Sequence, residues 1–281
     1  MSVTMVHNNY GKSQVQLMKV ARRGEFHELQ NVTVKIAFEG NFTAAHINGD
    51  NSLVLPTDTM KNTVYALAQE IPEIEEIESF AQRLADYFLK HNPQVTQVIC
   101  EIDEHTWTRI TAGGQPHPHS FTKGSNEKHT TKVCATREAV SVESGVRDLV
   151  ALKTTNSGFA GFLKDHYTTL PETTDRIFAT SVTALWRYAR PVAATGAAWR
   201  SVRQTLLETF AGHNSNSVQH TLYAIGETVL EKYPDITEIA LSMPNIHCLP
   251  VDLARFGLPD TKQIFIPTEE PHGLIEARLT R

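Results

Sequence analysis

The sequence matches itself at two distant places, and this internal repeat limits the possible folds more than any other feature of the chain. Residues 89–98 align with residues 230–239. Each segment passes from a helical pattern, through Pro93 or Pro234, into a strand pattern. Self-similarity of this kind is typical of a duplicated structural module, not of one continuous fold.

A second, shorter match supports the duplication. Residues 63–67 and 221–225 both read Thr, an aliphatic residue, Tyr, Ala and a second aliphatic residue. We therefore predict two modules, the first at residues 1–138 and the second at residues 139–281. Chance similarity is the alternative, because helix–proline–strand junctions are common in proteins.

Alternating apolar residues predict strands. Residues 32–38 carry Val, Val, Ile and Phe at every second position, which is the pattern of a half-buried strand. Together with a less regular strand at residues 15–20, they predict an antiparallel hairpin. Further strands are predicted at residues 95–102, 106–111, 129–136, 140–146, 149–153, 177–190, 238–243, 264–267 and 274–279.

Apolar residues spaced three and four apart predict helices at residues 77–88, 197–210 and 218–232. Another helical pattern begins at about Asn62, after an apolar strand end at residues 53–55. Each half of the chain therefore runs through strands, then helices, then a proline-marked turn into a further strand.

The composition is that of an ordinary globular protein and excludes several classes of protein. The chain has 281 residues and a formal net charge of −5 at pH 7, which provides no basic surface for nucleic acid. No apolar run approaches the roughly 20 residues of a membrane helix, and the N-terminus lacks the apolar region of a signal peptide. We therefore expect no nucleic-acid or membrane partner. Three cysteines without a C-x-x-C pair indicate reduced thiols in a cytoplasm.

Thirteen histidines raise the possibility of a metal site. The closest pair, His117 and His119, flanks a proline inside a turn-rich segment at residues 113–125. A zinc site needs three or four converging ligands, and no two histidines have the i, i+4 spacing of a helix. We therefore interpret these side chains as solvated loop histidines and expect no metal. Phosphate-binding glycine loops and the Gly-x-Ser-x-Gly motif are also absent from the sequence.

Residues 54–68 carry a polar cluster between an apolar stretch and a helical pattern. Thr57, Asp58 and Thr59 are typical N-cap and turn residues, so the ordinary interpretation is a helix start. The order of residues 57–65, Thr-Asp-Thr-Met-Lys-Asn-Thr-Val-Tyr, closely resembles the urate oxidase (uricase) family. In that family the Thr-Asp pair lies at the active site.

Four other segments resemble the same family and occur in the family's order. They are Tyr-Gly-Lys at residues 10–12, a block with Phe and Arg at residues 157–176, Ser-Val-Gln-His-Thr-Leu-Tyr at residues 217–223 and Met-Pro-Asn-Ile-His at residues 243–247. The resemblance covers nearly the whole chain. It departs at residues 248–250, Cys-Leu-Pro, where many relatives have aromatic residues, and we expect a local difference in packing there.

The resemblance implies an α+β fold of two tandem T-fold (tunnelling-fold) modules. Each module would be an antiparallel sheet with helices on one face, and several chains would assemble into a β-barrel. The implied activity is a cofactor-independent oxidation of urate by dioxygen and water to 5-hydroxyisourate and hydrogen peroxide. A pterin- or GTP-handling T-fold enzyme and a non-catalytic purine-binding oligomer are the alternatives.

The resemblance also assigns roles to individual residues. Lys12, Thr57 and His247 resemble the proton-relay triad and are the expected catalytic residues. Asn245 resembles the residue that holds dioxygen or the attacking water above the ring. The expected substrate-binding residues are Thr57, Asp58, Phe159, Arg176, Val218, Gln219 and Asn245.

These assignments have chemical reasons. The ring of Phe159 can stack on a purine, a contact worth roughly 0.5–1.5 kcal/mol beyond burial. Arg176 and Gln219 offer forked donors and an amide that can recognise the carbonyl and N–H edge of urate. Without the family resemblance, these three side chains would be interpreted as core, surface ion pair and helix start.

The family further implies a homotetramer whose active sites are shared between subunits. Lys12, Thr57 and Asp58 would come from one subunit, and the other site residues from its neighbour. A sheet of two tandem modules has two open edges, which a second subunit can cover. The last residues, Leu-Thr-Arg, differ from the peroxisomal tripeptide common in animal and fungal urate oxidases, so we expect a bacterial or engineered form.

Overall fold

The computed structural model describes residues 3–259, 261–268 and 270–281. They divide into two compact units. Unit 1 comprises Met1–Gly145 and Arg187–Trp199, and unit 2 comprises Val146–Trp186 and Arg200–Arg281. Among the helices of the described residues, none combines the length and the apolar character needed to cross a membrane.

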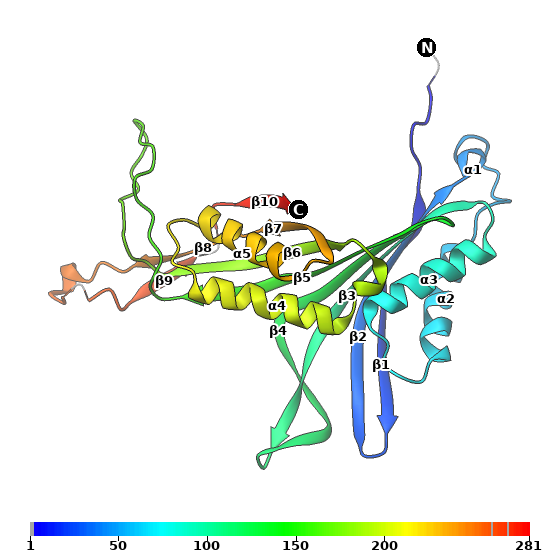
Figure 1. Cartoon of the computed structure of the whole chain (residues 1–281), viewed down its shortest axis with the longest axis horizontal. Helices are drawn as coiled ribbons and strands as arrows, with labels where there is room; N and C mark the ends of the chain where they lie inside the picture. Colours follow the sequence, from blue (N-terminus) through cyan, green and yellow to red (C-terminus); the bar gives the residue numbers. More distant parts are fainter. Residues whose placement is uncertain (1–2, 260, 269) are drawn as a thin grey trace. The chain divides into compact units, whose positions relative to one another are not determined.

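Unit 1 is built on an antiparallel sheet with the strand order β1-β2-β3-β4. These strands are β1 (Tyr10–Arg23), β2 (Phe26–Gly40), β3 (Val95–Ala112) and β4 (Gln115–Ala135) (Figure 1). The predicted hairpin is the pair of β1 and β2. Its apolar alternation places Val34 and Ile36 in the core, because successive side chains of a strand point to opposite faces.

The helices α1 (Thr43–Asn48), α2 (Thr57–Glu70) and α3 (Ile77–His91) also belong to unit 1. Helix α2 packs on β1, and α3 packs on β3 and β4 (Figure 1). Helix α3 buries Leu84 and Phe88 at a spacing of one turn, which is the apolar face that the sequence predicts.

Unit 2 contains a second run of neighbouring strands in the order β5-β6-β7-β10, with β8 paired to both β6 and β9. The strands are β5 (Val140–Lys153), β6 (Phe178–Tyr188), β7 (Ile236–Ser242), β8 (Asn245–Pro250), β9 (Phe265–Thr268) and β10 (Glu276–Thr280). Strand β5 begins in unit 1, and the last two residues of β6 also belong to unit 1. Strand β10 is antiparallel to β7.

Two longer helices follow β6 in the chain, α4 (Gly196–Gly212) and α5 (Val218–Lys232), and short 3-10 turns occur at Pro191–Ala193 and Ala254–Phe256. Helix α5 packs on β7 and β10 (Figure 1). Gly226 allows this close approach, because a Cβ atom there would lie 2.9 Å from a methyl carbon of Leu279.

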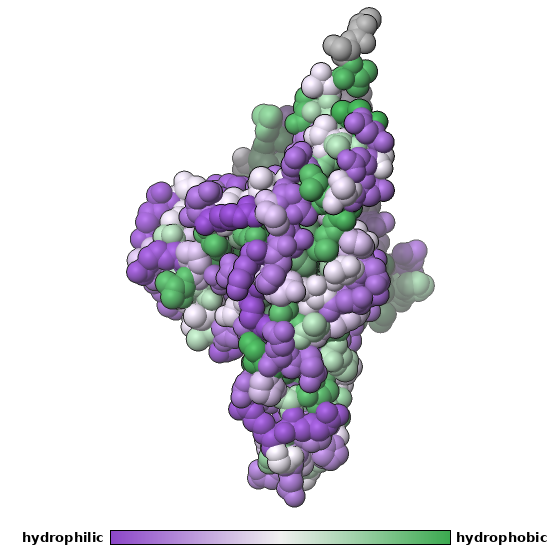
Figure 2. Space-filling model, turned by 90° about the vertical axis from the view of Figure 1, so that its right-hand side faces the viewer, coloured by the Kyte–Doolittle hydropathy of each residue, from purple (hydrophilic) through white to green (hydrophobic). Residues whose placement is uncertain are grey.

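Large apolar side chains are also found on the surface. Examples in unit 2 are Leu249, Phe256 and Ile266, each more than half exposed. Figure 2 shows hydrophobic residues scattered among hydrophilic ones on the face that it presents. Scattered exposed apolar residues are normal in globular proteins, so we assign no function to them individually.

The α+β class and the antiparallel sheets are confirmed, as are the helices predicted at residues 77–88, 197–210 and 218–232. The two halves also repeat one junction in detail. Asn92 and Tyr233 end α3 and α5 with similar backbone angles, φ −130° and ψ 84° against φ −119° and ψ 88°. Each then accepts a hydrogen bond at its carbonyl from a residue three positions on, Val95 or Ile236, at 3.0 Å.

The shorter match is not part of the same alignment. In the first half, the two matched segments lie on different helices, residues 63–67 on α2 and residues 89–91 on α3. Their counterparts in the second half both lie on α5. One helix of the second half would therefore have to match two helices of the first. The module boundary between residues 138 and 139 stays a prediction.

Several local predictions are wrong. The first helix after the central polar cluster begins at Thr57 and not at Asn62, because the polar residues form its first turn after Pro56. Residues 53–55 are not a strand, and the expected loop at residues 113–125 is mostly strand β4. The missed first half of β4 carries mainly polar side chains, so its sequence lacks the apolar alternation that predicts a strand. Strands β3 and β5 each replace two predicted pieces, and α1 and β8 were not predicted.

Candidate active site

Unit 1 positions Lys12 on β1, opposite Ile36 of β2. A bulge follows between Lys12 and Val15, where Gln14 has a φ of 57°. The residue before Lys12 is also constrained, because a Cβ atom on Gly11 would collide with the carbonyl oxygen of Ile36. Glycine and the bulge together set the course of the strand at Lys12. The sequence identified Gly11 only as part of a motif and assigned it no role.

Thr57 and Asp58 form the first turn of α2, next to the same strand. Asp58 accepts hydrogen bonds from Nζ of Lys61 at 2.5 Å and from Nδ2 of Asn62 at 3.0 Å. The hydrogen bond and charge of Lys61 hold the pKa of Asp58 below its usual value, and the charge of Lys12 acts in the same direction. The Lys12 ammonium therefore lies within electrostatic reach of the helix start.

Unit 2 folds residues 157–176 into a loop that returns on itself. Phe159 and Thr173 exchange backbone hydrogen bonds of 2.8 and 3.0 Å, and Arg176 N–H donates to the carbonyl of Ser157 at 2.7 Å. These bonds bring the guanidinium carbon of Arg176 to 5.5 Å from the centre of the Phe159 ring. The two residues expected to stack on and clamp the substrate are thus adjacent.

The guanidinium of Arg176 has an unused donor. Its Nε is buried and has no hydrogen-bond partner among the residues that the structure describes. Burial lowers the pKa of this guanidinium, which nonetheless stays protonated, as arginine does in proteins. A buried cationic donor without a partner is costly, and a carbonyl or anionic ligand would satisfy it.

Val218 and Gln219 begin α5, and their position is coupled to the same loop. The Ser217 side chain caps the helix by accepting a hydrogen bond from the backbone N–H of His220 at 3.1 Å. Just before this cap, the carbonyl of Ser215 accepts a hydrogen bond from Gly158 N–H at 2.8 Å. Val218 is buried, whereas Gln219 is exposed at the helix start. Ser217 was not assigned a role from the sequence, although Ser before an apolar helix is a known capping signal.

Asn245 and His247 lie on β8 with Nδ2 of Asn245 3.3 Å from Nδ1 of His247. Asn245 is opposite Thr180 of β6, and its N–H donates to the carbonyl of Gly273 at 2.9 Å. His247 is opposite Thr268 of β9. The predicted residues therefore form three groups, each held by its own contacts: one in unit 1, and the Phe159 and Asn245 groups in unit 2.

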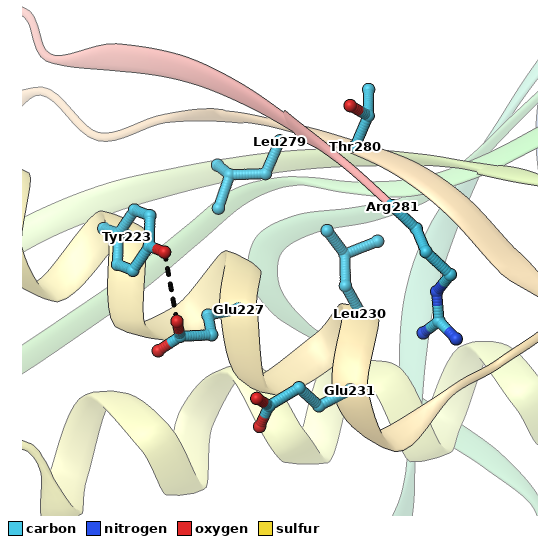
Figure 3. Close-up of a pocket in the computed structure, with 7 residues that line it drawn as sticks. All are labelled: Tyr223, Glu227, Leu230, Glu231, Leu279, Thr280 and Arg281. Atoms are coloured by element: carbon cyan, nitrogen blue, oxygen red, sulfur yellow. Dashed lines mark hydrogen bonds between the residues drawn. The ribbon is translucent and has the colours of Figure 1, made fainter.

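A groove of about 440 Å³ lies elsewhere in unit 2, between α5 and β10 (Figure 3). Figure 3 shows the Tyr223 hydroxyl directed at Glu227, to which it donates a hydrogen bond of 3.0 Å. The lining residues are Tyr223, Glu227, Leu230, Glu231, Leu279, Thr280 and Arg281. Since no predicted site residue lines this groove, it is not the candidate active site.

We predicted that His117 and His119 lie in a loop. They lie instead on strand β4, where His117 is half-buried. Their ring centres are 4.6 Å apart. Within the described part of the chain, no group of three or more His, Cys, Asp or Glu side chains is arranged to hold a metal ion. That the protein works without a metal stays a prediction.

Comparison with known protein families identifies the family of this chain. The uricase family model matches residues 8–134 and 142–276. The chain belongs to the uricase family. The recognition that rested on five short segments is confirmed.

Uricase relatives match along nearly their whole length. The chain is 40% identical to Uricase-2 isozyme 2 of Glycine max, over 97% of this chain and 94% of the relative. It is also 40% identical to the uricase of Arthrobacter globiformis, over 99% of this chain and 90% of the relative. The crystal structure of that uricase superimposes with a TM-score of 0.94 and covers 100% of this chain and 96% of the other. A urate oxidase structure from Bacillus sp. TB-90, at 24% identity, matches in fold with a TM-score of 0.85.

Proposed function

We propose that the protein is a urate oxidase that converts urate, dioxygen and water into 5-hydroxyisourate and hydrogen peroxide. The observation that carries the proposal is the buried Nε of Arg176, which has no hydrogen-bond partner among the described residues and lies beside the Phe159 ring, in a chain of the uricase family. A planar anion with carbonyl groups satisfies both side chains at once, because the ring stacks on its face and the guanidinium binds its edge.

Substrate binding is assigned to unit 2 with two residues of α2. Arg176 and Gln219 recognise the carbonyl and N–H edge of urate, Phe159 stacks on its face, and buried Val218 supports the helix start. Thr57, Asp58 and Asn245 complete the proposed substrate set. These contacts orient the anion so that one face is open to dioxygen.

Proton transfer is assigned to Lys12, Thr57 and His247. Urate must lose protons to become electron-rich enough to react with dioxygen, so a relay of a lysine, a hydroxyl and an imidazole has a chemical task. Asn245 lies beside His247, where its amide can hold dioxygen or the attacking water. We propose that the enzyme needs no cofactor for this chemistry.

We further propose a homotetramer with active sites shared between subunits. Strand β1 is the last strand at one end of the strand order, in unit 1, and β10 is the last strand at the other end, in unit 2. Open edges of this kind are covered or paired in native proteins, and a second subunit can supply the partner strand. Lys12, Thr57 and Asp58 would then meet the remaining site residues across a subunit boundary. The β-barrel assembly rests on the same argument.

The alternatives are a pterin- or GTP-handling T-fold enzyme and a non-catalytic purine-binding oligomer, and family membership does not favour them. We also propose that the protein is located in the cytoplasm. Its three free cysteines support this, because a reducing compartment keeps thiols reduced.

An aerobic assay with a chelator present tests the proposed function. The ultraviolet absorbance of urate should disappear without any added cofactor, and hydrogen peroxide should form in equal amount. A purine-binding oligomer would leave the absorbance unchanged. Activity that is lost on exhaustive chelation and returns with one particular metal would contradict the cofactor-independent reaction.

A further inference from the structure

Tyr10 connects the strand that carries Lys12 to the segment that carries Thr57. Its hydroxyl oxygen accepts a hydrogen bond of 2.9 Å from the backbone N–H of Leu55, two residues before Thr57. Its ring is held edge-on against Phe38 and Phe42, with centres 5.8 and 4.7 Å away. The ring that carries the hydroxyl is therefore packed against two buried side chains of the core.

The strand continues from Tyr10 directly to Lys12. Side chains two apart on a strand point to the same face, and the bulge begins only after Lys12. A movement of β1 at Tyr10 would accordingly move Lys12 with it. The close approach of Gly11 to Ile36 restricts such movement on the strand side.

The helix start has weaker local restraints. Pro56 occupies the N-cap position of α2 and provides no side-chain hydrogen bond to the first turn. Proline also has no N–H, so the Leu55 amide is the last backbone donor before Thr57. Burial raises the pKa of the Tyr10 phenol, although the Leu55 hydrogen bond opposes this, so the phenol remains an uncharged acceptor at neutral pH.

We propose that Tyr10 is a positioning residue for proton transfer, which fixes Thr57 with respect to Lys12 through its hydrogen bond to Leu55. This inference rests on the proposed function, because it assigns Lys12 and Thr57 to one relay. Tyr10 acts through its neighbours and does not itself touch the substrate.

The test is the Tyr10→Phe variant, which keeps the ring in the core and removes only the hydroxyl. Tyr65→Phe is the matched control. Tyr65 also joins α2 to β1, through a hydrogen bond of 3.4 Å from its hydroxyl to the carbonyl of Gln16, but it lies two turns beyond Thr57. Each variant loses one tyrosine hydroxyl that bonds a backbone group, in Tyr10→Phe between β1 and Leu55 just before α2, and in Tyr65→Phe between α2 and β1.

We expect Tyr10→Phe to lower kcat about tenfold and to change KM for urate by less than about twofold, since misplacing a reacting group affects rate more than binding. Tyr65→Phe should leave both constants unchanged. Deuterium exchange of a peptide covering residues 53–58 should show that the Leu55 amide loses protection in Tyr10→Phe only. Thermal unfolding of both variants checks that each remains folded.

Two outcomes overturn the inference. One is an unchanged kcat or an unchanged Leu55 protection in Tyr10→Phe, and the other is an equal loss of kcat in both variants. A wild-type chain that leaves urate unoxidised would instead overturn the proposed function, and the relay role of Tyr10 with it. An active wild type therefore separates the two hypotheses.

Discussion

Nε2 of His129 lies 2.8 Å from Oε1 of Glu78, and both side chains are buried in unit 1. The other ring nitrogen of His129 lies 3.2 Å from Oε2 of Glu104, so the imidazole lies between two carboxylates. Ser144 donates a second hydrogen bond to Oε1 of Glu78 at 2.6 Å, and the Trp199 ring stacks on the imidazole at 4.2 Å. A doubly protonated imidazolium can donate to both carboxylates at once.

The pH dependence of stability follows from this cluster. Burial alone would lower the pKa of His129, but the hydrogen bonds and charges of Glu104 and Glu78 outweigh it and raise the pKa to about 9. The folded value is above the unfolded value of about 6.5, so the stabilisation is complete below pH ~6.5 and is lost as the pH rises through about 9. The free energy of unfolding should fall by on the order of 3 kcal/mol over this pH range. Urea unfolding between pH 6 and 10 measures it, and a His129→Gln variant should lack this alkaline loss.

Glu78→Gln should strongly destabilise unit 1. Burial works against ionisation of Glu78, but the hydrogen bond and charge of His129 and the Ser144 hydroxyl keep its pKa below the usual value. The neutral amide would leave the buried cation of His129 with one carboxylate partner fewer. The free energy of unfolding should fall by roughly 3–5 kcal/mol, as is typical when a buried ion pair is broken. Denaturant midpoints give the value. Glu73→Gln, an exposed residue before the same helix, is the control and should change stability by less than about 0.5 kcal/mol.

Arg176→Ala should raise KM for urate by roughly 10- to 150-fold, since a charge-assisted contact is worth about 1.5–3 kcal/mol. Steady-state kinetics under air measure the change. Arg255→Ala provides the control, because Arg255 also lies 5.5 Å from a phenylalanine ring, that of Phe256, but is exposed. A similar KM in the wild type and Arg176→Ala would remove Arg176 from the proposed binding set.

Lys12→Met should mainly lower kcat, because the proposed role of Lys12 is proton transfer and the methionine keeps an unbranched side chain of similar length without the amine. KM for urate should change much less than in Arg176→Ala. Lys35→Met, on the neighbouring strand, removes a lysine that pairs with Glu101 at 3.3 Å and should leave kcat unchanged. Equal effects of Lys12→Met and Arg176→Ala on KM alone would contradict the division of roles.

Complementation tests the shared active site. Thr57→Ala and Arg176→Ala chains, each nearly inactive alone, are mixed, unfolded and reassembled. If the pocket combines residues of two subunits, some interfaces contain both wild-type residues and part of the activity returns. Verified mixed oligomers that stay as inactive as either parent would show that each chain holds its own site.

Local patterns in the sequence were sufficient for part of the fold. Helix α5 has the predicted bounds, 218–232, because Ser217 caps its start and an apolar face runs along it. Strand β2 follows from its alternating apolar residues. Strand β4 was missed in its first half, because the side chains of residues 115–125 are mainly polar and its pairing with β3 depends on the backbone. Residue type alone does not report such pairing.

The sequence by itself determined the family, the longer helices and several of the strands, and which residue types could handle an anion and its protons. Only the tertiary structure decided which of those residues meet. Glu78 has the sequence of a solvated acid at a helix start, yet the fold buries it against His129, 51 positions along the chain. Likewise, only folding shows that the buried Nε of Arg176 has no partner within the described part of the chain and that Tyr10 reaches Leu55. Burial and contacts between distant residues depend on packing of the whole unit, and no local pattern encodes them.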